Sequence, residues 1–67
     1  MNGVEGFTIS TRIDAGAMTI SANREGLLSL ANCLIELAEG APGSHIHLDA
    51  YNSLEQGSPE LIIERTQ

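Results

Sequence analysis

The sequence predicts an α+β domain of ββαββ order, in which one helix packs on one face of a four-stranded sheet. Three observations support this: helical periodicity over residues 23–39, two-residue alternation on either side of it, and breaker residues between these segments. At 67 residues the chain is a single domain, and we expect its ordered core to span about residues 6–65.

The first predicted element is a β-hairpin over residues 6–22. Phe7, Ile9 and Ile13 fall on one face of an extended chain whose other positions are polar and often β-branched. Asp14-Ala15-Gly16 has the composition of a turn, and alternation resumes after it with Met18 and the apolar residues that follow.

The predicted helix divides into an apolar and a polar half when its residues are placed about 100° apart. The apolar half, which we expect to pack on the sheet, holds Leu27, Leu28, Leu30, Ala31, Leu34, Ile35, Leu37 and Ala38. The half expected to face solvent holds Glu25, Ser29, Asn32, Glu36 and Glu39. Ser21 or Asn23 can cap the N-terminus, and Gly40 lies where a left-handed C-terminal cap belongs.

Residues 40–43 end the helix, and two further strands follow over residues 44–49 and 61–65. Between them, residues 51–59 have the composition of a loop. The continuous apolar run of the last strand predicts a central place in the sheet. If Ile62 points away from the helix with Met18 or Tyr51 nearby, that face of the sheet is a candidate contact surface.

Composition narrows the classes of function. Nine Asp and Glu residues against three Lys and Arg give a formal charge of −6, which argues against nucleic-acid binding and against attraction to anionic lipid. The same charge attracts a basic partner, or serves solubility alone. One cysteine, no leader and no apolar run of membrane-spanning length predict a soluble cytoplasmic protein, and the small size leaves homodimer formation open.

Few residues suggest chemistry. His45, His47 and Asp49 alternate on a strand and have the side chains of a zinc site, although two exposed histidines beside a polar loop give the same pattern. Cys33 borders the apolar half of the helix, where free cysteines usually pack as small hydrophobic residues. Gly26 in the first helical turn suggests a close approach of the backbone to a neighbouring strand or subunit, although tolerance of a poor helix former gives the same pattern. We therefore expect neither catalytic residues nor a cofactor.

The carboxylates of the second hairpin form either a solvated rim or a docking surface for a cationic partner. A catalytic role would require a pocket that shifts their pKa values, and a chain this short offers little concavity. The partner-binding residues predicted on this argument are Asp49, Glu55, Glu60 and Glu64.

Three segments together resemble the immunity protein 32 family of bacterial polymorphic toxin systems. They are Arg24-Glu25-Gly26-Leu27-Leu28-x-Leu30-Ala31, His45-Ile46-His47-Leu48-Asp49 and Ser58-Pro59-Glu60-Leu61-Ile62-Ile63-Glu64, so that the resemblance spans about residues 19–65. The resemblance implies a small cytoplasmic, non-catalytic protein that binds and neutralises a cognate toxin.

An acidic protein suits a basic toxin such as a nuclease, because acidic side chains can occupy the groove that otherwise binds phosphates. Two alternatives stay open. One is a homo-oligomeric structural or regulatory domain that associates through a sheet edge or through the helix flank at Gly26. The other, a His-based metal-binding protein, would use His45, His47 and Asp49.

Overall fold

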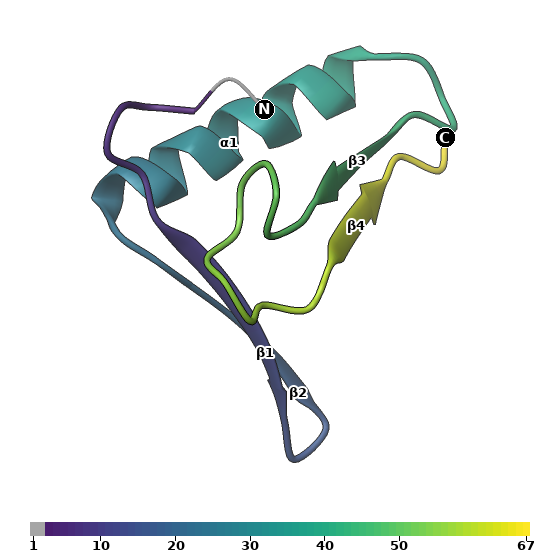
Figure 1. Cartoon of the computed structure of the whole chain (residues 1–67). Helices are drawn as coiled ribbons and strands as arrows, with labels where there is room; N and C mark the ends of the chain where they lie inside the picture. Colours follow the sequence, from purple (N-terminus) through teal and green to yellow (C-terminus); the bar gives the residue numbers. More distant parts are fainter. Residues whose placement is uncertain (1–2) are drawn as a thin grey trace.

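A computed structural model describes residues 3–67 and confirms the α+β class and the ββαββ order (Figure 1). The elements are β1 (Ile9–Asp14), β2 (Ala17–Ala22), α1 (Arg24–Glu39), β3 (His45–Leu48) and β4 (Leu61–Glu64). The strands form two separate antiparallel pairs, β1–β2 and β3–β4, instead of one four-stranded sheet. In residues 3–67, no helix is both long and apolar enough to cross a bilayer.

The first hairpin forms where the sequence predicts it. Asp14 pairs with Ala17, and the two residues between them, Ala15 and Gly16, have φ angles of 49° and 83°. Positive φ at both central residues is the geometry that matches the twist of a two-residue hairpin. Ile9 at the base is fully buried, whereas Ile13 near the tip is 63% exposed, so the hairpin projects from the body of the protein (Figure 1).

The two sheets meet through a loop that runs along β1. The Glu55 amide donates to the Ile9 carbonyl at 2.8 Å, but the next two bonds use side chains. The Thr11 amide donates to Ser58 Oγ at 3.2 Å, and Thr11 Oγ1 donates to the Pro59 carbonyl at 2.6 Å. Because Pro59 has no N–H to donate, a regular ladder does not extend into the second hairpin. The expected central position of the last strand was therefore wrong: β4 pairs only with β3 in the described part of the chain.

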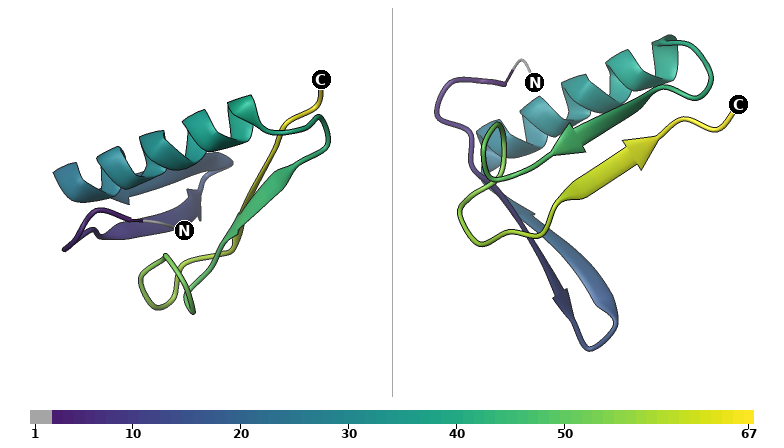
Figure 2. Two further views of the ribbon diagram at one scale, coloured as in Figure 1. Left: turned by 90° about the horizontal axis from the view of Figure 1, so that it is seen from above. Right: turned by 45° about the vertical axis from the view of Figure 1, so that its right-hand side comes forward.

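The core lies where α1, the base of the first hairpin and the inner face of the second hairpin meet. Figure 2 shows α1 alongside β3, with β4 on the far side of β3 from the helix. The most buried apolar cluster is Ile9, Leu48, Leu54 and Leu61, against which Phe7, Ala22, Leu30 and Ile63 pack.

The helix presents a different face to this core from the one predicted. Its buried residues are Gly26, Ser29, Cys33 and Leu37, and Ser29 has no exposed surface. Of the predicted core face, Leu27, Leu28, Leu34 and Ile35 are 40–56% exposed, and Ala31 and Ala38 are exposed as well. The helix is thus rotated about its axis: Leu30 and Leu37 face inward as predicted, together with Gly26, Ser29 and Cys33, while the other six residues of the predicted core face point outward.

Backbone proximity explains this rotation. A Cβ atom added to Gly26 would lie 2.1 Å from the carbonyl oxygen of Thr8, which confirms the close approach predicted at this glycine. The buried hydroxyl of Ser29 accepts from the Val4 amide at 2.6 Å and donates to the Glu25 carbonyl at 2.7 Å. Because its hydroxyl both accepts and donates a hydrogen bond, Ser29 can be buried at little cost.

Asn23 caps the helix N-terminus, which decides between the two predicted candidates. Its Oδ1 accepts from the Gly26 amide at 2.7 Å and from the Thr8 amide at 3.0 Å, and its Nδ2 donates to the Gly6 carbonyl at 3.0 Å. One side chain therefore fixes both the helix start and the segment that leads into β1.

The predicted left-handed cap at Gly40 was wrong, because Gly40 has a φ of −82° and the positive φ, 86°, occurs at Gly43. The guanidinium of Arg65 donates to the Gly40 carbonyl instead. It brings positive charge to a helix end whose last turn has no basic residue of its own.

Candidate functional site

The outer face of the β3–β4 hairpin carries the candidate site. His45 pairs with Glu64 and His47 with Ile62, while Ile46, Ile63, Leu48 and Leu61 form the alternate pairs that face the helix. Ile62 is 53% exposed and points away from the helix, which was the first requirement for treating this face as a contact surface. Met18 lies on the other hairpin and is not part of this face.

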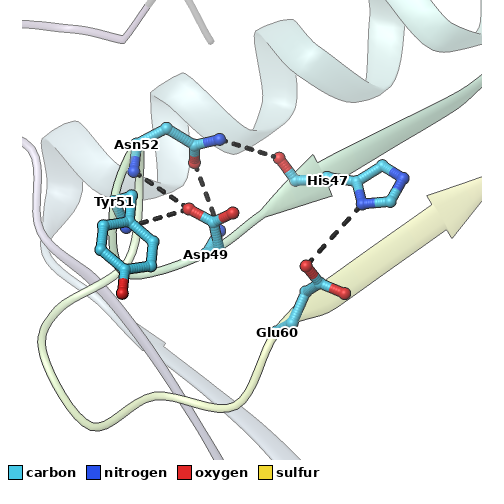
Figure 3. Close-up of polar contacts among 5 residues, drawn as sticks. All are labelled: His47, Asp49, Tyr51, Asn52 and Glu60. Carbon is cyan, nitrogen blue, oxygen red and sulfur yellow. Dashed lines mark hydrogen bonds and ion pairs between the residues drawn. The ribbon is translucent and has the colours of Figure 1, made fainter.

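A local turn at the end of β3 presents Tyr51 to solvent. Asp49 Oδ1 accepts from the amides of Tyr51 and Asn52 at 2.9 and 3.1 Å, and Asn52 Oδ1 accepts from the Asp49 amide at 3.2 Å (Figure 3). Such self-bonding turns are typical of Asp and Asn. The result is a tyrosine ring that is 97% exposed, next to the acidic strand end.

The two histidines lie on this face. Nδ1 of His47 lies 3.8 Å from Oε2 of Glu60, and the rings of His45 and His47 meet edge to face with centroids 4.9 Å apart (Figure 3 shows the first contact). Over residues 3–67, no group of three or more His, Cys, Asp or Glu side chains is arranged to hold a metal ion. The triad of the metal hypothesis does not assemble in the described residues, and Asp49 uses its carboxylate to hold the turn.

The structure brings three of the four predicted partner-binding carboxylates to one face. Glu64 lies on β4 two residues after Ile62, Glu60 directly precedes β4, and Asp49 directly follows β3. Glu55 lies apart, since its backbone is bonded to β1 through Ile9. We call the set His45, His47, Asp49, Tyr51, Glu60, Ile62 and Glu64 the acidic hairpin face.

Tyr51 was predicted only as a possible neighbour of Ile62, and the two histidines were not among the predicted partner-binding residues. The Asp-x-Tyr-Asn pattern could have predicted the exposure of Tyr51, because Asp and Asn side chains form a turn that directs the ring away from the core. The signal for the histidines was the alternation of β3 itself, which pairs them across the sheet with Ile62 and Glu64.

Cys33 has the packing role that the sequence suggested. It is 6% exposed on the buried side of α1. Burial raises the pKa of its thiol above the ordinary value, which lowers the fraction of the nucleophilic thiolate.

Comparisons with known proteins relate this fold to a family. The family model described as Immunity protein 32 matches residues 17–66, from β2 to the residues just after β4. Neither a curated protein nor a solved structure with significant similarity to the chain was found. The match includes the helix and the whole acidic hairpin face, and it covers well over half of the chain. The chain therefore belongs to the immunity protein 32 family, and its role is of the immunity type.

Proposed function

We propose that the protein binds a cognate bacterial toxin and neutralises it by covering the toxin's working surface, with no catalytic step. Membership of an immunity protein family supports this function. The observation that carries the choice of surface is the acidic hairpin face, where carboxylates surround two exposed apolar side chains.

The arrangement of this face suits a protein partner. Tyr51 and Ile62 offer apolar area that is 97% and 53% exposed, and interfaces commonly concentrate their binding energy in such anchors. Glu60, just before β4, and Glu64, within it, each lie two residues from Ile62. A charged rim around apolar anchors is the usual plan of a protein interface.

Charge indicates the kind of toxin. With a formal net charge of −6, the protein is steered towards a basic surface, and a nuclease has such a surface in the groove that binds phosphates. Carboxylates placed in that groove would exclude the nucleic acid. In this scheme Glu60 and Glu64 contact the toxin, Asp49 holds Tyr51 in place, and Glu55 adds charge beside the first hairpin.

The test is isothermal titration of the purified protein against the toxin domain encoded next to its gene, at low and at high salt. We expect one-to-one binding that weakens with salt. Glu64→Lys should weaken binding by about tenfold or more, because it places like charges together within the interface. Tyr51→Ala should raise the rate of dissociation, because it removes an anchor.

Glu36→Lys is the matched control, because Glu36 is an exposed carboxylate on α1 and the charge change is identical. It should leave the affinity within about threefold, through the change in net charge alone. Equal losses from Glu64→Lys and Glu36→Lys would mean that net charge matters and the hairpin face does not. Absence of binding at either salt concentration would refute the proposed function.

A further inference from the structure

The exposed side of α1 carries a continuous apolar stripe. Its members are Leu27, Leu28, Ala31, Leu34, Ile35 and Ala38, all exposed, with the four larger ones 40–56% exposed. The buried residues of the helix lie on the opposite side, where α1 contacts β2 and β3. We call these six residues the helix stripe. Contiguous apolar surface of this kind on a small protein marks an interaction site.

The spacing of the helix stripe indicates that another helix covers it. Leu27 and Leu34, Leu28 and Ile35, and Ala31 and Ala38 are each seven residues apart. A seven-residue repeat keeps one seam facing a neighbouring helix that crosses at a shallow angle. The small side chains of Ala31 and Ala38 allow two helix axes to approach closely along that seam.

The stripe is also symmetric about Ala31. Leu28 and Leu27 precede Ala31 by three and four positions. Leu34 and Ile35 follow it by three and four positions. In an antiparallel pair of α1 helices centred on Ala31, the Leu27–Leu28 pair of one copy lies level with the Leu34–Ile35 pair of the other. A two-fold dimer needs a surface that complements itself in this way.

Charge favours the same arrangement. Arg24 lies on the stripe side of the helix start, and an antiparallel partner places its Ala38 and Glu39 at that level. The guanidinium of each copy can then reach the Glu39 carboxylate and the negative end of the other helix. In a parallel pair the two Arg24 side chains would instead face each other.

From these observations we infer that the protein forms a two-fold homodimer in which the helix stripes of two copies pack antiparallel, centred on Ala31. The contact, which extends from Arg24 through the helix stripe to Ala38, is about 21 Å long and falls at the lower end of stable interfaces.

The dimer is independent of toxin binding. The acidic hairpin face lies on the side of β3–β4 away from the helix, so the two surfaces point in different directions. Gly26, in contrast, belongs to the intramolecular contact with Thr8 and does not lie on the stripe. The proposed dimer surface is therefore the helix stripe, on the opposite side of α1 from the flank at Gly26 that the sequence suggested.

Sedimentation equilibrium of the full chain from about 5 to about 500 µM tests the inference, because a dimer of micromolar affinity dissociates within that range. Ala31→Glu, which places two carboxylates at the two-fold axis, should weaken the dimer by about tenfold or more. Asn32→Glu adds the same charge to the next residue, off the stripe, and should change the dimer constant by about threefold at most. Circular dichroism verifies that both variants remain folded.

A charge exchange tests the antiparallel direction. Arg24→Glu should weaken the dimer, and the double variant Arg24→Glu/Glu39→Arg should restore it, since each new arginine would face the new glutamate of the other copy. A monomer at every concentration, or a dimer that Ala31→Glu leaves unchanged, overturns the inference. Failure of the double variant to recover overturns the antiparallel arrangement.

Discussion

Substitution of Gly26 by alanine provides a direct test of the packing between the helix and the segment before β1. In most exposed helical positions this change stabilises a protein, by about 1 kcal/mol at most. Here the new methyl group would lie 2.1 Å from the Thr8 carbonyl oxygen and 2.9 Å from the Ala22 Cβ atom. The helix and the Thr8 backbone must therefore move apart.

The expected cost follows from what that movement disturbs. Overpacking a closed contact costs about 1–3 kcal/mol. Displacement of Thr8 also weakens its bonds with Asn23, at 3.0 and 3.3 Å, each of which contributes about 1 kcal/mol. After the gain in helix propensity is subtracted, we expect Gly26→Ala to lower the free energy of unfolding by about 1–3 kcal/mol.

Urea unfolding monitored by circular dichroism measures this change, at a protein concentration low enough to hold the chain monomeric. Asn32→Gly and Asn32→Ala are the controls, because Asn32 is exposed on the same helix and the difference between the two variants gives the propensity term alone. A Gly26→Ala protein as stable as the wild type would show that the Thr8 contact does not restrict this position.

Three further measurements test the contacts described above. Asn23→Ala should lower the free energy of unfolding by about 2–3 kcal/mol, more than the loss of an ordinary helix cap, because three hydrogen bonds are lost. Asn23→Asp should lower it less, because the oxygen that accepts two of these bonds remains. Burial raises the pKa of the Cys33 thiol, so this thiol stays protonated in the folded state. The free energy of unfolding should be constant below the pKa of the unfolded thiol and fall as pH rises towards the pKa of the folded one. Urea titrations of Cys33→Ala should no longer show that fall. Arg65→Met should destabilise the fold by about 1 kcal/mol in the same assay and increase amide hydrogen exchange in the last turn of α1, whereas unchanged exchange there would contradict the capping role of Arg65.

Much of the fold could be predicted because local rules decide it. The turn at Ala15–Gly16, the cap at Asn23 and the alternation of His45–Leu48 each depend on residues close together in sequence. The approach of backbone at Gly26 was predictable for the same reason, since a glycine early in a helix costs stability unless its missing side chain is needed.

The rotation of α1 and the division of the sheet could not be predicted in this way, because distant segments decide them. The burial of Ser29 depends on the Val4 amide, 25 residues away, and a polar residue looks solvent-facing until its partner is known. The break in the sheet depends on the contact of Thr11 with Pro59, which brings a residue without an N–H to the free edge of β1.

The candidate site was also predictable only where residues close in sequence decide its geometry. The sequence placed Glu60 and Glu64 in or near the second hairpin, and the pairing of β3 with β4 puts Ile62 and Glu64 opposite the two histidines. The separation of Glu55 from that face depends on a single long-range bond to Ile9, which no spacing rule predicts.

The attachment of the second loop to β1 also affects how the chain folds during synthesis. The buried cluster around Ile9 is complete when Leu48, Leu54 and Leu61 have been added, and residues 55–59 bond to the free edge of β1. A nascent chain that has reached the end of α1 therefore exposes both an incomplete core and an unpaired strand edge. Because these contacts join distant parts of the sequence, the protein should become stable, and able to bind a partner, only after β4 has left the ribosome.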